Sequence, residues 1–171
     1  MPQTTQTAQT AVAAVAVDSE TRADCSDHQS LRLWLRLLAC THLVEAPLRQ
    51  RLRIFFDGSL PRFDLMAQLD RHPQGLKMRE LSRRLMVTGG NVTGLTDRLV
   101  AEGLVERRDD TQDRRACTIA LTLAGQHQFQ AMALAHEAWV IEMFSGLDSR
   151  QQAQLFELLG LLKLSLAAKT D

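Results

Sequence analysis

Arginines and aspartates crowd a short segment of this chain, and their side chains are suited to binding a polyanion. Guanidinium groups pair with phosphates, and arginine is favoured in the narrow, strongly negative minor groove of DNA. Three neighbouring carboxylates resemble a metal site, but the arginines beside them would repel a cation, so we expect no metal. We expect the aspartates to hold the arginines in position. The arginines are Arg107, Arg108, Arg114 and Arg115, and the aspartates are Asp109, Asp110 and Asp113.

The preceding segment, residues 89–101, combines the spacing of a helix with glycines. Val92, Leu95 and Leu99 lie on one side at 100° per residue, which predicts a buried face. Gly90 and Gly94 fall on the opposite side, although an interior glycine costs a helix about 1 kcal/mol relative to alanine. A helix edge without side-chain bulk could approach the floor of a major groove. Alternatively, the glycines could admit a second helix at close range.

Polar residues border this bare edge. Asn91, Thr93, Asp97 and Arg98 flank it, and of these Asn91, Thr93 and Arg98 could reach base edges or phosphates. Thr88 could cap the helix at its start. The helix and the arginine-rich segment therefore predict two parts of one nucleic-acid interface.

Further elements must position these two segments. Residues 78–85 show helical spacing, and "MVT" then forms a tight turn into the glycine-containing helix. Residues 105–107 and 117–121 predict the strands of a β-hairpin, because the period changes to two. Helix, turn, helix and charged hairpin form a winged helix-turn-helix, which we place at residues 61–122. The predicted fold class is mainly α with a small β-hairpin wing.

Helices are also predicted on both sides of this domain, at residues 28–56 and 123–171. Pro47 predicts a kink or break near Ala46 in the first of them. The last helix contains "LFELLGLLKLSL", which is apolar on more than one side, as is typical of a helix that packs against a second copy. We therefore predict a helical dimerisation region and a homodimer. Residues 1–27, rich in Thr, Gln and Ala, predict a disordered N-terminal tail.

The composition argues against several classes of protein. Lysine plus arginine and aspartate plus glutamate number 20 each, yet residues 71–115 hold ten basic and seven acidic residues, so a positive face is possible. No apolar run reaches the ~20 residues of a membrane span. No Lys or Arg precedes "AVAAVAV", so we expect no secretory leader and a cytoplasmic protein. We find no phosphate loop or catalytic grouping, and therefore expect neither an enzyme nor a bound cofactor.

The predicted domain also resembles a known family. The MarR family of bacterial transcriptional regulators has a DNA-binding core similar to "MRELSRRLMVTGGNVTGLTDRLVAEGLVERRDDTQDRRACTIALTLAG". Here "LTDRLVAEGLVER" matches the end of the recognition helix and the first wing strand, "DRR" the wing motif, and "LTLAG" the exit into the next helix. The resemblance implies a homodimer joined through its first and last helices, with Asp113 orienting the wing and Arg115 entering the minor groove.

Together the residues and the resemblance predict a DNA-binding regulator, with a repressor favoured, that binds a pseudo-palindromic operator in double-stranded DNA. Its two recognition helices would reach half-sites about one helical turn apart. The predicted DNA-binding residues are Thr88, Gly89, Gly90, Asn91, Thr93, Gly94, Arg98, Arg107, Arg108, Asp113, Arg114 and Arg115.

A small-molecule effector is a further expectation. The resemblance implies a ligand pocket between the dimerisation layer and the DNA-binding lobes, and it extends to family members that control aromatic-acid catabolism. Arginines and aromatic side chains could hold an aromatic carboxylate or its CoA thioester, although a solvated arginine face over core neighbours explains them as well. The candidate ligand-binding residues are Trp34, Arg36, Leu38, His42, Arg49, Arg53, Arg62, Phe63 and Met66.

Two alternatives remain open. A cysteine-based redox-sensing regulator would use Cys40 or Cys117, but we expect both to be buried and inert, and the chain lacks the tyrosines that assist such cysteines in the family's peroxide sensors. A winged-helix protein-interaction adaptor would have the same fold and would not touch DNA. Only DNA binding would give a steep dependence on salt.

Overall fold

The computed structural model describes residues 28–85, 89–109 and 117–169. The chain divides into two compact units, Met1–Leu43 and Val44–Asp171. The predicted tail, the "MVT" turn and the tip of the wing lie outside the described residues.

The first helix, α1 (Gln29–Phe56), continues through Pro47. Of the kink or break expected near Ala46, the break is therefore wrong, and the kink stays a prediction. A proline inside a helix removes one backbone hydrogen bond, because its nitrogen has no hydrogen to donate to the carbonyl four residues earlier, which here belongs to Leu43. Leu43 is exposed, so water can satisfy that carbonyl while the rest of the helix continues.

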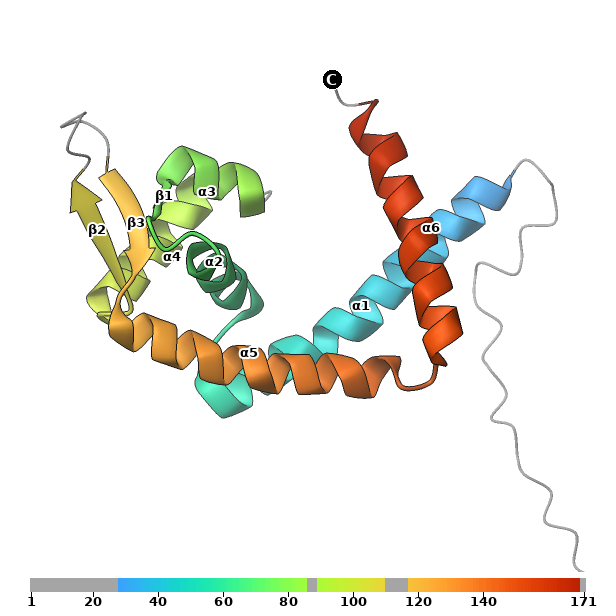
Figure 1. Ribbon diagram of the computed structural model, residues 1–171, viewed down its shortest axis with the longest axis horizontal. Helices are drawn as coiled ribbons and strands as arrows, with labels where there is room; N and C mark the ends of the chain where they lie inside the picture. Colours follow the sequence, from blue (N-terminus) through green and yellow to red (C-terminus); the bar gives the residue numbers. More distant parts are fainter. Residues whose placement is uncertain (1–27, 86–88, 110–116, 170–171) are drawn as a thin grey trace, which may run out of the picture. The chain divides into compact units, whose positions relative to one another are not determined.

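The remaining elements form the predicted winged helix-turn-helix and two further helices, all within the second unit (Figure 1). Helices α2, α3 and α4 contact one another or the strands, and α2 also packs against α5. The elements are α2 (Leu60–Asp70), β1 (Leu76–Lys77), α3 (Met78–Leu85), α4 (Gly89–Ala101), β2 (Val105–Asp109), β3 (Cys117–Leu121), α5 (Leu123–Phe144) and α6 (Ser149–Ala167).

The strands form a small antiparallel sheet in the order β1-β3-β2. Val105 pairs with Leu121 and Asp109 with Cys117, which confirms the predicted hairpin. Strand β1 was not predicted. Its two residues, Leu76 and Lys77, pair with Ile119 and Thr118, and two residues are too few to show a period.

The core of the second unit lies between α2, α4, α5 and the sheet. Its fully buried side chains include Leu65 of α2, Leu99 of α4 and Ile119 of β3. Thr96 of α4 is also completely buried, and its hydroxyl oxygen has no hydrogen-bond partner among the described residues. The Thr96 hydroxyl on the inner face of α4 has thus lost its contact with water without gaining a hydrogen bond among the described residues.

The end of α4, the end of β3 and the start of α5 meet at one tight junction. Gly103 has a positive φ of 72°, which turns the chain out of α4. The Thr122 hydroxyl donates to the Gly103 carbonyl over 2.7 Å and accepts from the Gly125 amide over 3.0 Å. A Cβ added at Gly125 would lie only 1.9 Å from the Leu104 carbonyl oxygen. The junction therefore requires glycine at that position.

The first prediction tests this junction. Gly125→Ala should lower the free energy of unfolding by about 3 kcal/mol, because the new methyl group forces α5 away from Leu104. Gly146→Ala is the matched control, since a Cβ there meets no described atom within 4 Å. Urea unfolding followed by circular dichroism measures both. Equal stability of the two variants would contradict the packing described.

The second prediction concerns the buried hydroxyl. Thr96→Val should raise the free energy of unfolding by about 1 kcal/mol, because it removes an unpaired polar atom and leaves the shape of the side chain unchanged. Thr122→Val is the contrasting variant. It should cost about 1 kcal/mol, because this hydroxyl makes two hydrogen bonds at the start of α5. A loss of stability in Thr96→Val would show that its hydroxyl has a partner.

Candidate nucleic-acid interface

Helix α4 presents a bare edge to solvent. Val92 and Leu99 are buried, which confirms the predicted inner face. A Cβ placed on Gly90 or Gly94 would meet no described atom within 4 Å. The glycines therefore do not make room for a neighbouring element in the part of the chain that the structure describes, and the helix-packing alternative loses its support there.

Polar side chains border the bare edge as predicted. Asn91, Thr93 and Arg98 are all exposed. Arg98 also lines a cleft of about 460 Å³ between the start of α2 and α4, together with Ser59 and Asp64. Burial and the nearby Glu45 raise the pKa of Asp64. Thr88 lies outside the described residues.

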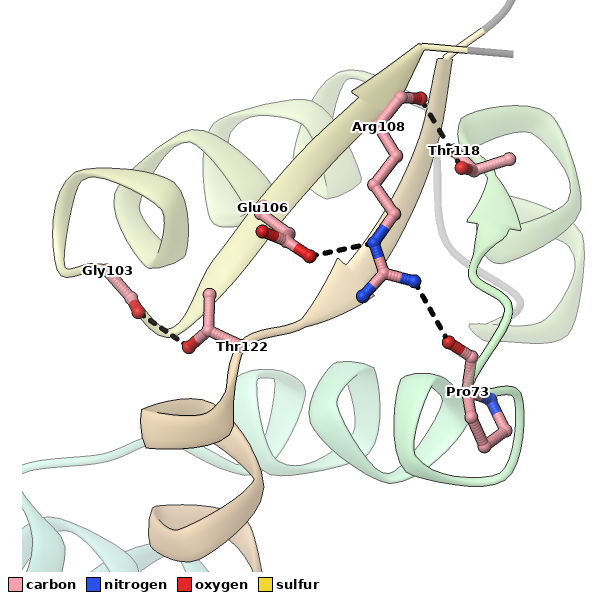
Figure 2. A network of polar contacts seen from close by, with 6 residues as sticks. All are labelled: Pro73, Gly103, Glu106, Arg108, Thr118 and Thr122. Atoms are coloured by element: carbon pink, nitrogen blue, oxygen red, sulfur yellow. Dashed lines mark hydrogen bonds and ion pairs between the residues drawn. The ribbon is translucent and has the colours of Figure 1, made fainter. Parts of the chain in front are cut away.

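The two described wing arginines have different partners. Arg107 on β2 donates to the Asp97 carboxylate of α4, which joins the wing to the helix. Arg108 binds other groups. Its Nε donates to Glu106 over 2.7 Å, and its Nη1 donates to the Pro73 carbonyl over 3.2 Å (Figure 2). Successive residues of a strand point to opposite faces, so these two side chains diverge.

The wing aspartates were expected to hold these arginines in position, and because Asp110 and Asp113 lie outside the described residues, this stays a prediction. Among the side chains that the structure describes, the carboxylates that pair with them are Asp97 and Glu106, which come from α4 and from β2 itself. The contact between Arg107 and Asp97 arises because the hairpin brings β2 against α4. The predicted contacts at Asp113, Arg114 and Arg115 lie outside the described residues.

Several candidate ligand-binding residues of the second unit are engaged in its own structure. Arg62 pairs with Glu102 over 2.5 Å, and Arg49 pairs with Glu45. Met66 is fully buried. Arg53 is exposed on α1.

Aromatic stacking surrounds the remaining candidate in that unit. The Phe63 ring lies 4.4 Å from the His136 ring, measured between centroids, and 5.5 Å from that of Phe129. Burial lowers the pKa of His136. Sequence reasoning missed His136, because nothing in a lone histidine on α5 indicates which side chain of α2 it faces.

The candidates in the first unit all lie on α1. Trp34 and Arg36 are exposed, whereas Leu38 is partly buried, and His42 is exposed. Cys40 is also exposed, so the expectation that it is buried is wrong, while Cys117 is partly buried. At 100° per residue, Cys40 falls on the side of α1 opposite Leu31, Leu35 and Leu38, so it lies outside the apolar stripe that these residues form.

A second contact that sequence reasoning missed joins α1 and α5 within the second unit. Arg51 pairs with Glu142 over 2.7 Å and lies 5.8 Å from the centre of the Trp139 ring. This hydrogen bond lowers the pKa of Glu142. Phe55 and Phe56 pack against the same tryptophan. The end of α1 is thereby fixed to α5.

Two properties of the described residues bear on other functions. They contain no group of three or more His, Cys, Asp or Glu side chains placed to hold a metal ion. None of their helices combines the length and the apolar character needed to cross a membrane.

Comparisons with known proteins agree on one family. A protein-family model described as the MarR family matches residues 58–116. The chain is 37% identical over 84 residues to the HTH-type transcriptional regulator PrsX of Escherichia coli, a match that covers 49% of this chain and 50% of PrsX. The chain thus spans about half the length of that curated relative.

Solved structures are similar over more of the chain. A MarR family transcriptional regulator from Silicibacter pomeroyi is 32% identical with a TM-score of 0.71, and the match covers 85% of this chain and 99% of that one. The MepR-DNA complex of S. aureus is similar at 25% identity with a TM-score of 0.67, covering 80% of this chain and 97% of that one.

Proposed function

The chain belongs to the MarR family, and from that premise we propose that it is a ligand-responsive repressor that binds a pseudo-palindromic operator as a homodimer. One observation carries the proposal: the exposed face of α4 has no side chains at Gly90 and Gly94, and a wing arginine lies beside it. This combination suits a duplex, because a bare helix edge can enter the major groove while the wing follows the backbone.

The proposed contacts divide by their chemistry. Gly90 and Gly94 bring the helix backbone close, and Asn91, Thr93 and Arg98 contact base edges or phosphates. At the start of the helix, Thr88 and Gly89 complete this part of the surface. MepR, a protein of similar fold, has been solved in a complex with DNA, which supports this use of the fold.

The wing supplies the second set of contacts. We assign Arg107 to the DNA-facing side, and Arg114 and Arg115 to the tip, with Asp113 orienting it. Arg108 would reach DNA only by leaving Glu106 and the Pro73 carbonyl. As a repressor, the dimer would act by simple exclusion, because its occupation of two half-sites keeps other proteins off the same duplex.

Helix α6 supports the proposal of a homodimer. Large apolar side chains along it are exposed, among them Phe156, Leu161 and Leu164. None of its residues is buried within the described chain. Soluble monomers rarely expose so contiguous an apolar surface, and a second copy would cover it.

The effector is proposed to be an aromatic carboxylate or its CoA thioester, with aromatic catabolism as the regulated process. Arginine would pair with the carboxylate or the phosphates, and the aromatic side chains near α1 would stack on the ring. Binding can release DNA only if the effector prefers the state of the dimer that does not fit the operator.

The third prediction tests the bare edge of α4. Gly94→Leu should lower the affinity for an operator, selected from a random DNA pool by the wild-type protein, by more than about tenfold, because the leucine holds the backbone away from the groove. The fold should be unchanged, since the new side chain enters open space. Fluorescence anisotropy measures binding, and circular dichroism measures folding.

Gly146→Leu is the matched control, because it adds the same side chain in open space away from α4. It should bind as the wild type does. Full binding by Gly94→Leu would mean that this edge does not face the groove. Failure of the wild-type protein to bind any duplex at low salt would favour the protein-interaction adaptor.

The fourth prediction tests the dimer. The full chain should have twice its monomer mass of 19.2 kDa in light scattering. A chain ending at Asp148 lacks α6 and should be monomeric or aggregate, because it loses the proposed apolar interface. A well-behaved dimer without α6 would contradict the assignment.

A further inference from the structure

Asp97 lies beside the glycines, at one side of the bare edge of α4. At 100° per residue, Gly90, Gly94, Asp97 and Ala101 fall within a sector of about 60°. The Asp97 side chain is 52% exposed. A carboxylate therefore stands on the surface that is proposed to face the phosphates of DNA, where its charge opposes binding.

The charge of Asp97 is neutralised by the wing. Arg107 of β2 donates from Nη2 to Asp97 Oδ1. Its own side chain is 45% exposed. An ion pair so open to water contributes little to folding stability, since solvent screens it and both side chains lose conformational freedom. Its larger effect is on the electrostatic field that the surface presents.

We propose that Asp97 is a specificity-determining residue that suppresses binding to non-operator DNA by holding Arg107. This proposal rests on the proposed DNA-binding function. While the pair is closed, its net charge is zero, and Arg107 releases no counterion from an arbitrary duplex. The free energy needed to break the pair is offset only where the other contacts of α4 and the wing also form, as at an operator.

The obvious alternative role for Asp97 makes a different prediction. A carboxylate in the major groove can accept a hydrogen bond from the amino group of cytosine. In that role Asp97 would strengthen operator binding and leave other DNA unaffected. The two roles therefore differ in which class of DNA responds when the charge is removed.

The test uses the full chain with Asp97→Asn, which keeps the size of the side chain and removes its charge. The probes are duplexes of about 30 base pairs, long enough for two half-sites, of random sequence or carrying the selected operator. Affinity for the random duplex should rise about tenfold at about 50 mM salt. The slope of log K against log salt should steepen by about 0.9 per protomer, because one more phosphate is neutralised.

Two control variants isolate the effect. Glu137→Gln removes the same charge from an exposed position on α5 and should change random-duplex affinity by less than about twofold, since screening weakens distant charges. Adding Arg107→Ala to Asp97→Asn should abolish most of the gain and restore the wild-type salt slope. A gain that persists without Arg107 would overturn the proposal, because it would come from lost repulsion alone.

The remaining outcomes separate this proposal from the one it rests on. If Asp97→Asn binds operator more weakly and random DNA unchanged, Asp97 reads a base and the proposal is overturned. Unchanged affinity for both duplexes also overturns it, while DNA binding itself stands. If neither the wild type nor Asp97→Asn binds any duplex at low salt, the proposed function fails first.

Discussion

The close approach of Gly125 to the Leu104 carbonyl is the constraint on which the rest of the second unit depends. The Thr122 amide donates to the same carbonyl over 3.1 Å, and the Leu104 amide donates back to Leu99 in α4 over 3.0 Å. The last turn of α4, the end of β3 and the first turn of α5 are thereby joined within a few residues. Because α4 is fixed at this end and buried along its inner face, its orientation relative to β2 is determined, and with it the contact between Asp97 and Arg107.

Sequence reasoning correctly located the elements whose apolar side chains repeat with a clear period. Val92 and Leu99 placed the inner face of α4, and the alternation from Cys117 to Leu121 placed β3, because burial on one side imposes a period. Pro47 did not end α1, because the carbonyl that loses its hydrogen bond belongs to an exposed residue and water can satisfy it. Strand β1 could not be found, because it exists only through its pairing with β3.

The candidate site was predictable to a similar extent. Exposure of Gly90 and Gly94 followed from helical geometry alone. The partners of the arginines did not, because the Arg107–Asp97 contact depends on where β2 lies against α4, and the Arg108–Pro73 contact joins residues 35 positions apart. The Arg108–Glu106 contact lies within one strand, whereas these two contacts depend on tertiary packing. The effector site was the least predictable part from the sequence. Arginines and aromatic residues serve equally well in ion pairs and cores, as Arg62 and Phe63 do here.

Some glycines of this chain are required by the fold and others are not, and the second group bears on function. Gly103 is required by its positive φ, and Gly125 by the carbonyl against it. Gly90, Gly94 and Gly160 lie within helices in open space, and none of them has a positive φ. Alanine would fit at each and would favour the helix by up to about 1 kcal/mol, so the fold alone gives no reason for glycine. Two lie on the face proposed to meet DNA, and the third on the helix proposed to meet a second copy. A missing side chain costs the isolated chain stability and benefits only a surface that another molecule approaches closely, which is why these positions favour a DNA-binding dimer over a free-standing domain.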